Sequence, residues 1–192
     1  MKFKTFAKIT AVTWSCAFLG GLITGKSAFG DIFNGKPPEG AIECLAKNIY
    51  FESKSQSLAG QLAVGLVVLN RVKSKNFPND VCKVVYEGPI RESWKTRKDP
   101  SLPKDKRKYY PIRHRCQFSW YCDGFRDTIK EPTVYSKIVA VASKLMGKMI
   151  YDFTDGATHY HATYVSPDWT NLEVVFTIDD HIFYRPKQLK TK

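Results

Sequence analysis

Apolar side chains recur at helical spacing in three segments of the 192-residue chain, and each segment predicts a helix. The segments are residues 41–50, residues 58–72 after a suitable N-cap at Ser57, and residues 133–146. In the second segment, the run from Leu62 to Leu69 is apolar nearly all round. Such a helix has no polar face to turn towards water, so we expect it to form the buried centre of the domain. A short further helix is expected after Pro78.

After residue 146 the pattern changes to one that is typical of β-strands. Residues 157–164, 174–178 and 182–184 are rich in β-branched and aromatic side chains and alternate along the chain. The sequence therefore predicts an α+β fold, in which a helical lobe is followed by a small antiparallel sheet.

Residues 91–115 show neither pattern. They hold ten Lys or Arg, three acidic residues and three prolines. A segment with so few apolar side chains cannot form a packed element of its own, so we expect a long exposed loop.

The first thirty residues have the features of a secretory signal. Three lysines precede a mostly apolar, uncharged stretch over residues 9–23, which is shorter than the roughly 20 residues that a membrane span needs. Small residues at Ala28 and Gly30 predict cleavage after Gly30, and an uncleaved N-terminal anchor is the alternative. Both predict export to the periplasm, the envelope or the medium. Residues 31–40 then form a linker, residues 41–186 one domain and residues 187–192 a basic tail.

Charge and cysteines fit an exported domain. The net charge is +12, and loss of the four lysines in residues 1–30 lowers it to +8. A basic exported protein favours anionic envelope polymers as partners and disfavours nucleic acid. Four of the five cysteines follow the signal, and an even number in an oxidising compartment predicts disulfides. Three pairings are possible; the short loop favours Cys116–Cys122, which leaves Cys44–Cys82. A zinc site lacks the expected C-x-x-C pair.

Glu52 is the first candidate for chemistry. It follows the first predicted helix within the apolar and aromatic run Ile49-Tyr50-Phe51. Such neighbours would desolvate the carboxyl group and raise its pKa, as a general acid for a glycosidic oxygen requires. On the local sequence alone, an ordinary surface glutamate at a helix end remains the alternative.

Several motifs, in the same order, resemble the SleB/CwlJ family of cell-wall hydrolases over residues 41–185. They are CLAKNIYFE (44–52), GQLAV (60–64), VLNRV (68–72), FP (77–78), VCKVVY (81–86), CQFS (116–119), CDG (122–124), ATHYH (157–161), Trp169 and HIFYR (181–185). The resemblance implies that residues 41–186 are a catalytic domain. It also implies lytic transglycosylase or muramidase activity on peptidoglycan, between N-acetylmuramic acid and N-acetylglucosamine, with Glu52 as the catalytic glutamate.

The chain departs from the family pattern at two places. Where the family reads Ala-Arg-Gly-Glu after the catalytic glutamate, this chain has Ser53-Lys54-Ser55-Gln56, so the second acid is replaced by an amide. The basic segment 91–115 is also longer than the usual connection.

A single carboxylate suits transglycosylation, because hydrolysis with retention or inversion normally needs two acids. Glu52 would protonate the leaving oxygen and then take the proton from the 6-hydroxyl of the muramic acid, which leaves a 1,6-anhydro sugar. Candidate second acids are Asp123, Asp152, Asp155 and Asp168, and their spacing singles out none of them.

A sugar-binding cleft would need stacking rings and hydrogen-bonding groups. We expect Tyr160 and Trp169 to stack on substrate, together with Trp120, Tyr164 and Phe118, and expect hydrogen bonds from Gln117, Ser119 and His161. For each aromatic side chain, packing in the core is the alternative.

Two other functions remain open at this point. His159, His161 and His181 suggest a metal-dependent peptidase or amidase, although H-E-x-x-H is missing and structural histidines are the simpler interpretation. The basic segment, with Trp94, Tyr109 and Tyr110, suggests a non-catalytic wall-binding module. The preferred hypothesis is a monomeric enzyme without cofactor or metal that acts on peptidoglycan glycan strands. Either a bacterium or a phage could use it.

Overall fold

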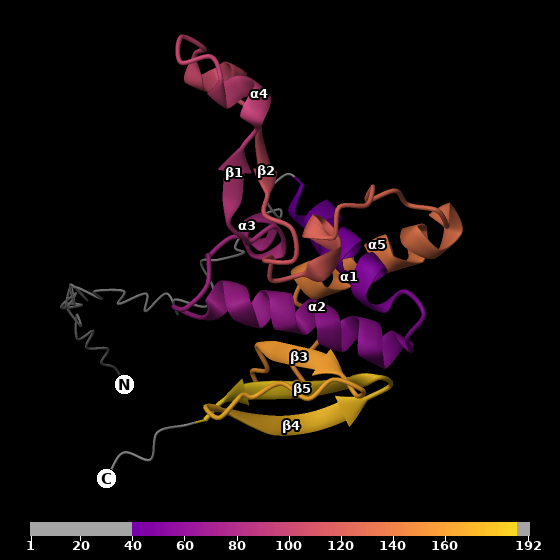
Figure 1. The fold of residues 1–192 in the computed structure, drawn as a ribbon. Coiled ribbons are helices and arrows are strands. Elements are labelled where there is room, and N and C mark those ends of the chain that lie inside the picture. The colour runs from indigo at the N-terminus through magenta and orange to yellow at the C-terminus, as the bar shows by residue number, and fades with distance from the viewer. Residues whose placement is uncertain (1–39, 188–192) are drawn as a thin grey trace, which may run out of the picture. The chain divides into compact units, whose positions relative to one another are not determined.

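The computed structural model of the protein describes residues 40–187 (Figure 1). The predicted signal, the linker up to residue 39 and the tail from residue 188 lie outside the described residues. Within residues 40–187, no helix is long and apolar enough to cross a membrane.

Four helices form the first lobe, as the hydrophobic pattern predicts. They are α1 (Ala41–Ser53), α2 (Leu58–Lys73), α3 (Val81–Val85) and α5 (Pro132–Met146). The side chain of Ser57 caps α2 by accepting a hydrogen bond from the backbone N–H of Gly60, which confirms the predicted N-cap. Residues 63–72 of α2 are all buried, so this helix is the centre of the domain.

The first helix is longer than the sequence suggests, and this moves Glu52. Glu52 lies in the last turn of α1 and not beyond its end. The backbone N–H of Lys54 still donates to the carbonyl of Tyr50, and the Ser53 hydroxyl donates to the carbonyl of Ile49. Because these bonds continue the helix, the direction of the Glu52 side chain is fixed by a packed element.

The helices α1, α2 and α5 approach one another most closely at Gly65. A Cβ atom on Gly65 would lie 2.5 Å from a methyl group of Leu145 on α5 and 3.0 Å from one of Ile49 on α1. A side chain at this position would therefore require the ends of the Leu145 and Ile49 side chains to move.

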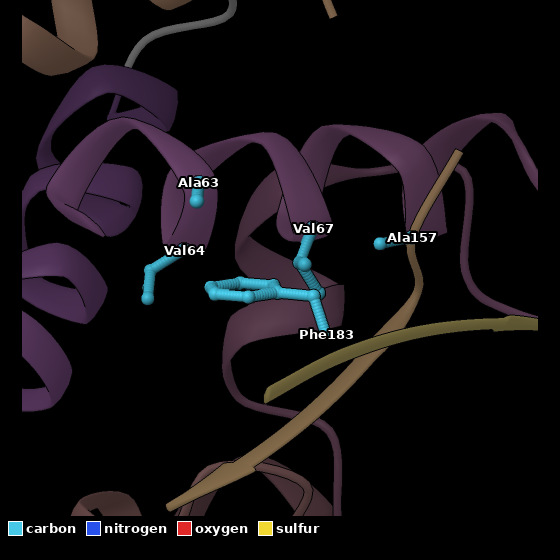
Figure 2. Close-up of a cluster of buried hydrophobic side chains, with 5 residues drawn as sticks. All are labelled: Ala63, Val64, Val67, Ala157 and Phe183. Atoms are coloured by element: carbon cyan, nitrogen blue, oxygen red, sulfur yellow. The ribbon is translucent and has the colours of Figure 1, made fainter. Parts of the chain in front are cut away.

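A three-stranded antiparallel sheet forms the second lobe, which confirms the predicted α+β class. Its strands are β3 (His159–Ala162), β4 (Leu172–Ile178) and β5 (His181–Pro186), in the order β3-β5-β4. The sheet packs on the side of α2 that faces away from α1 (Figure 1). Figure 2 shows the contact, in which Phe183 lies against Ala63, Val64 and Val67 of α2 and beside Ala157. Thus α2 is covered on both sides.

The basic segment is ordered, and the prediction of a plain loop was wrong. It contains β1 (Ile90–Glu92), α4 (Trp94–Arg97), the 3-10 helix η1 (Lys104–Lys106) and β2 (Tyr109–Pro111). Strands β1 and β2 pair as an antiparallel ribbon, with Arg91 opposite Tyr110. We call residues 90–111 the basic hairpin; in Figure 1 it extends away from α2 and the sheet.

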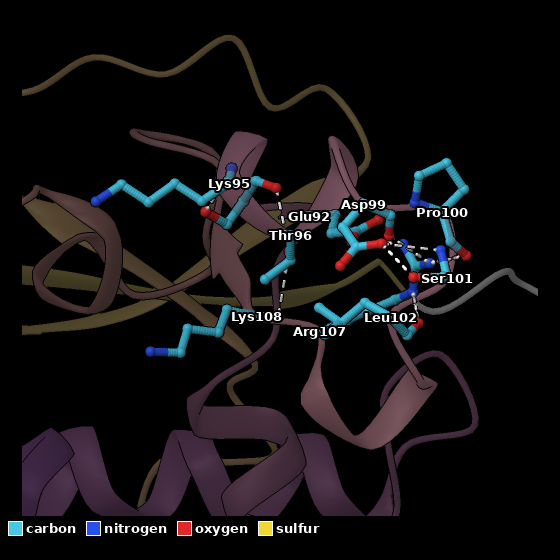
Figure 3. Close-up of polar contacts among 10 residues, drawn as sticks. Glu92, Lys95, Thr96, Asp99, Pro100, Ser101, Leu102, Arg107 and Lys108 are labelled. Carbon is cyan, nitrogen blue, oxygen red and sulfur yellow. Dashed lines mark hydrogen bonds and ion pairs between the residues drawn. The ribbon is translucent and has the colours of Figure 1, made fainter.

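A polar network takes the place of an apolar core in the basic hairpin (Figure 3). Arg107 donates to the carboxylate of Glu92 at 2.8 Å and to the carbonyl of Leu102 at 3.1 Å. Its second terminal nitrogen donates to the carbonyl of Pro100 at 3.1 Å. Both side chains of the Arg107–Glu92 pair are only 18% exposed, so water screens this pair less than a surface pair. Composition alone does not reveal such a network.

Two disulfides connect the four cysteines that follow the predicted signal. One joins Cys44 on α1 to Cys82 on α3, and the other joins Cys116 to Cys122 across a short loop. These are the pairings that the sequence favours. The first bond holds α3 against α1, and the second closes the loop that leads into η2 (Ser119–Cys122).

We predict that peptide mapping under non-reducing conditions recovers Cys44 with Cys82 and Cys116 with Cys122, with no free thiol among them. Replacing Cys44 and Cys82 together by alanine should lower the free energy of unfolding by about 2–5 kcal/mol, the usual cost in a small exported domain. Recovery of Cys44 joined to Cys116 would contradict the pairing.

Candidate functional site

A cleft of about 500 Å³ opens beside the last turn of α1. Its walls come from α1, from residues 116–123 around η2, and from β3 with the residues that follow it. It is lined by Glu52 and by seven of the eight predicted substrate-binding residues, all except Trp169: Gln117, Phe118, Ser119, Trp120, Tyr160, His161 and Tyr164. Positions more than sixty residues apart in the sequence are thus brought into one site.

The carboxyl group of Glu52 lies in this cleft and has one direct hydrogen bond. Its Oε2 accepts from the hydroxyl of Tyr160 at 3.0 Å. Burial raises the pKa of Glu52 above its ordinary value, while the bond from Tyr160 and the positive charge of Arg71 partly oppose this shift. The site therefore holds a carboxyl group that keeps its proton to higher pH than an exposed glutamate would.

Tyr160 has a different place from the one the sequence predicts. Its ring packs against Phe183 and His181, with centroids 5.5 and 5.1 Å apart, so its faces are not free to stack on a sugar. Burial, first, and the nearby charge of Glu52 raise the pKa of Tyr160 well above its usual value. The hydroxyl thus remains protonated and donates to Glu52.

Arg71 is the residue that the sequence interpretation missed. It is only 5% exposed, near the end of α2, and its Nε donates to the carbonyl of Thr158 at 2.7 Å. Its guanidinium group lies over the rings of Phe77 and Phe118, with centroids 5.1 and 4.9 Å away. Burial lowers the pKa of Arg71, but a guanidinium group remains charged in proteins. The feature of the sequence that could have identified Arg71 is its position inside an otherwise apolar helix.

Arg71 also carries an energetic cost. Its Nη1 is buried and has no hydrogen-bond partner in the part of the chain that the structure describes. An unpaired buried donor destabilises a fold by about 1–3 kcal/mol. Groups held at such a cost are typical of functional sites, and Arg71 lines the same cleft as Glu52.

Gln56, at the position of the missing family acid, does not belong to this cleft. Its Nε2 donates to Asp180 Oδ2 at 3.2 Å, in the turn between β4 and β5. The neighbouring Asp179 accepts from the backbone N–H and hydroxyl of Ser57. A Cβ on Gly60 would lie 2.4 Å from the Asp179 carboxylate, so a glycine there permits this contact. A glutamate at position 56 would face Asp180, and the amide avoids that repulsion.

Two of the three histidines of the metal hypothesis, His159 and His161, have separate hydrogen-bond partners. His161 Nδ1 donates to the carbonyl of Ala162 at 2.8 Å, and its Nε2 lies 2.7 Å from the Tyr184 hydroxyl. His159 Nδ1 lies 2.9 Å from the hydroxyl of Thr158. Burial lowers the pKa of both His159 and His181. Among residues 40–187, no three His, Cys, Asp or Glu side chains are grouped so that they could hold a metal ion.

The predicted aromatic residues fall into two groups. Tyr164 lines the cleft and is 88% exposed, so its ring is open for stacking. Phe118 and Trp120 also line the cleft but are mostly buried, and Trp120 stacks on Phe51 at 4.7 Å. Trp169 does not line the cleft. Its ring packs instead against the rings of His159, His161 and Tyr184.

Of the four candidate second acids, only Asp123 lines the cleft. Its Oδ1 accepts from the backbone N–H of Phe125 at 2.7 Å, as in a tight turn. Asp152 accepts from the backbone N–H of Thr154, and Asp155 pairs with Arg185.

Comparison with known families and proteins finds relatives of this chain. A family described as Cell Wall Hydrolase matches residues 55–184. Over 46 residues, the chain is 46% identical to a spore cortex-lytic enzyme of Bacillus cereus (strain ATCC 14579) and 41% identical to one of Bacillus subtilis (strain 168). Each match covers 24% of this chain, but only 18% and 15% of those enzymes.

Two solved structures share the fold. The catalytic domain of the SleB protein of Bacillus cereus gives a TM-score of 0.52 at 23% identity, over 81% of this chain and 97% of that one. The catalytic domain of SleB from Bacillus anthracis, described as a germination-specific lytic transglycosylase, gives 0.50 at 25% identity, over 79% and 98%. The architecture of both lobes is therefore one that known catalytic domains use.

The raised pKa of Glu52 predicts how its replacement changes stability with pH. An acid whose pKa is higher in the folded state stabilises the fold fully only below its unfolded pKa, and this contribution is lost as pH rises through the folded pKa. Glutamine does not titrate and can still accept from Tyr160. The melting temperature of Glu52→Gln relative to the unchanged protein should therefore rise between about pH 4 and neutral pH. A constant difference across thermal scans in this range would contradict the buried carboxyl group.

Proposed function

Because the chain belongs to the cell wall hydrolase family, we propose that it cleaves the glycan strands of peptidoglycan between N-acetylmuramic acid and N-acetylglucosamine. The observation that carries the proposal is the partly buried carboxyl group of Glu52, with its raised pKa, in a cleft of about 500 Å³. Glu52 precedes the span that the family matches, so its assignment rests on this geometry and on the motif around it.

The first step requires a proton donor. With its pKa raised by burial, Glu52 carries the proton and gives it to the glycosidic oxygen as that bond breaks. The leaving sugar then departs as a neutral alcohol, and positive charge develops at the anomeric carbon of the muramic acid.

The second step requires the same group as a base. Once Glu52 has lost its proton, the hydroxyl of Tyr160 and the charge of Arg71 stabilise the carboxylate. The carboxylate takes the proton of the muramic acid 6-hydroxyl while that oxygen attacks the anomeric carbon. The product is a 1,6-anhydro sugar, no water is consumed, and Glu52 is returned to its protonated form.

The engagement of Asp123 supports transglycosylation over hydrolysis. Its Oδ1 holds a turn by accepting from Phe125, whereas a base or nucleophile needs a carboxylate directed at substrate. We assign substrate binding to four residues that line the cleft and follow α1 in the sequence. They are Gln117, Ser119, His161 and Tyr164, whose ring is exposed.

We further propose that the enzyme acts outside the cytoplasmic membrane as a monomer, with the basic hairpin in contact with anionic polymers of the envelope. The signal-like N-terminus and the disulfides support export. The basic hairpin offers exposed charge that is mainly positive, since exposed Lys and Arg residues outnumber the exposed Asp99 and Asp105.

Glu52→Gln should reduce the release of fragments from purified peptidoglycan by about 10² to 10⁴-fold, because general acid catalysis is removed while the fold is kept. Glu43→Gln is the matched control, since Glu43 is an exposed glutamate on the same helix, paired only with Lys47. The control should retain full activity. Equal activity of the two variants would show that Glu52 is not the acid.

Mass spectrometry of the released fragments should find 1,6-anhydromuramic acid ends, which are lighter by one water than hydrolysed ends. Asp123→Asn should leave the product and the rate within about a factor of three, since turn-forming asparagine can replace aspartate. Hydrated ends in the products, lost together with activity in Asp123→Asn, would establish hydrolysis with two acids instead.

A further inference from the structure

A second cleft, of about 520 Å³, lies on the basic hairpin. It is formed between the end of β1, α4 and β2, and none of its lining residues also lines the cleft of Glu52. The basic hairpin therefore carries a concave site of its own, and its charge is not merely spread over a convex surface.

The cationic groups of this cleft are available to a ligand. Arg91 and Arg97 line it and are exposed, and within residues 40–187 no hydrogen bond or ion pair engages their guanidinium groups. The acid in the lining, Glu92, is already paired with Arg107. Guanidinium groups bind carboxylate and phosphate groups in a bidentate manner, so the free pair favours an anionic ligand.

Two aromatic rings complete the cleft. Trp94 is 56% exposed and Tyr110 is 54% exposed, and both line the space next to Arg91 and Arg97. The ammonium group of Lys98 lies 4.8 Å from the centre of the Trp94 ring. An exposed ring beside cations is poorly placed to enter the hydrocarbon of a bilayer, but it can stack on the apolar face of a sugar.

The cleft is also held in shape without a ligand. Arg107 fixes β1 to the turn that follows α4, and the backbone N–H of Ser93 donates to the carbonyl of Lys108 at 2.7 Å (Figure 3). The Ser93 side chain caps α4. Binding would therefore require little ordering of the chain, which lowers the entropic cost of association.

We propose that this cleft binds an anionic saccharide polymer: a sugar ring stacks on Trp94 or Tyr110 while a carboxylate or phosphate group of the same polymer pairs with Arg91 and Arg97. The choice of a wall polymer as its source rests on the proposed function. Carboxylates of peptidoglycan stem peptides are the source we favour, because they lie on the same polymer that Glu52 cleaves. The cleft then holds the enzyme on the insoluble wall, while short soluble fragments reach Glu52 without it.

The test uses the full chain carrying Glu52→Gln, so that the wall is not degraded during binding. Sedimentation with purified peptidoglycan freed of phosphate polymers measures the affinity. Arg91→Gln with Arg97→Gln should weaken binding by about tenfold or more, and Trp94→Ala should also weaken it. The matched control is Lys104→Gln with Lys108→Gln, which removes the same charge from exposed residues of the basic hairpin outside the cleft. The control should change affinity by less than about twofold.

Equal losses in the two double variants would overturn the proposal, because they would show diffuse attraction to charge. The proposal also fails if Arg91 and Arg97 matter for binding to anionic phospholipid vesicles or duplex DNA but not for binding to peptidoglycan. If the arginine pair matters only for binding to poly(glycerol phosphate), which has no sugar ring, the cleft is a phosphate site and the proposal of a saccharide site is overturned. The proposed function is tested separately: in the chain with active Glu52, the Arg91 and Arg97 changes should leave cleavage of short soluble fragments unchanged.

Discussion

The helix α2 has no polar side, and most other features follow from the need to cover it all round. The helices α1 and α5 pack on one side, where Leu145 and Ile49 lie close to Gly65, and the sheet packs on the other through Phe183. This arrangement brings the last turn of α1 and the strand β3 to the same end of the molecule. Glu52 and Tyr160 come from these two elements, and Arg71 comes from α2 between them. The cleft therefore forms where three elements meet around one buried helix.

The same burial sets the chemistry of the cleft. A carboxyl group that served only as an acid would need burial alone, which raises its pKa. One that served only as a base would need strong hydrogen-bond donors, which lower its pKa. Glu52 has both influences: burial favours the protonated form, while Tyr160 and Arg71 favour the carboxylate. Because these influences oppose each other, neither form of the carboxyl group is favoured by all of its surroundings, and the proposed mechanism uses both forms. The positive charge of Arg71 acts on Glu52 without forming a direct ion pair with it. The unpaired Nη1 of Arg71 is part of the energetic cost of burying this charge near Glu52.

Sequence patterns predicted what is local and missed what depends on contacts between distant segments. The helices, the cap at Ser57 and the α+β order follow from periodicity, because burial of one face imposes it. The same pattern could place Tyr160 on one side of a strand but could not show that its hydroxyl meets Glu52, 108 positions earlier in the chain. The pattern of apolar residues in the helix assigned no role to Arg71. Trp169 is a residue type that often stacks on sugars, but here its ring packs against His159 and Tyr184. The fold, and not the residue type, decides which face of a ring stays open.

The basic hairpin shows why composition is a weaker guide than connectivity. The small number of apolar residues in this segment predicted a loop. The prediction would be correct if the hydrophobic effect alone ordered the segment. Yet one arginine, half-buried and bonded to a carboxylate and several carbonyls, provides the constraint that an apolar core provides elsewhere. Because Arg107 satisfies these internal acceptors, Arg91 and Arg97 need not be used for folding and stay free at the surface of the basic hairpin. An ordered segment built in this way keeps its charge for a partner, whereas a segment that folded by pairing every charge internally would have none to offer.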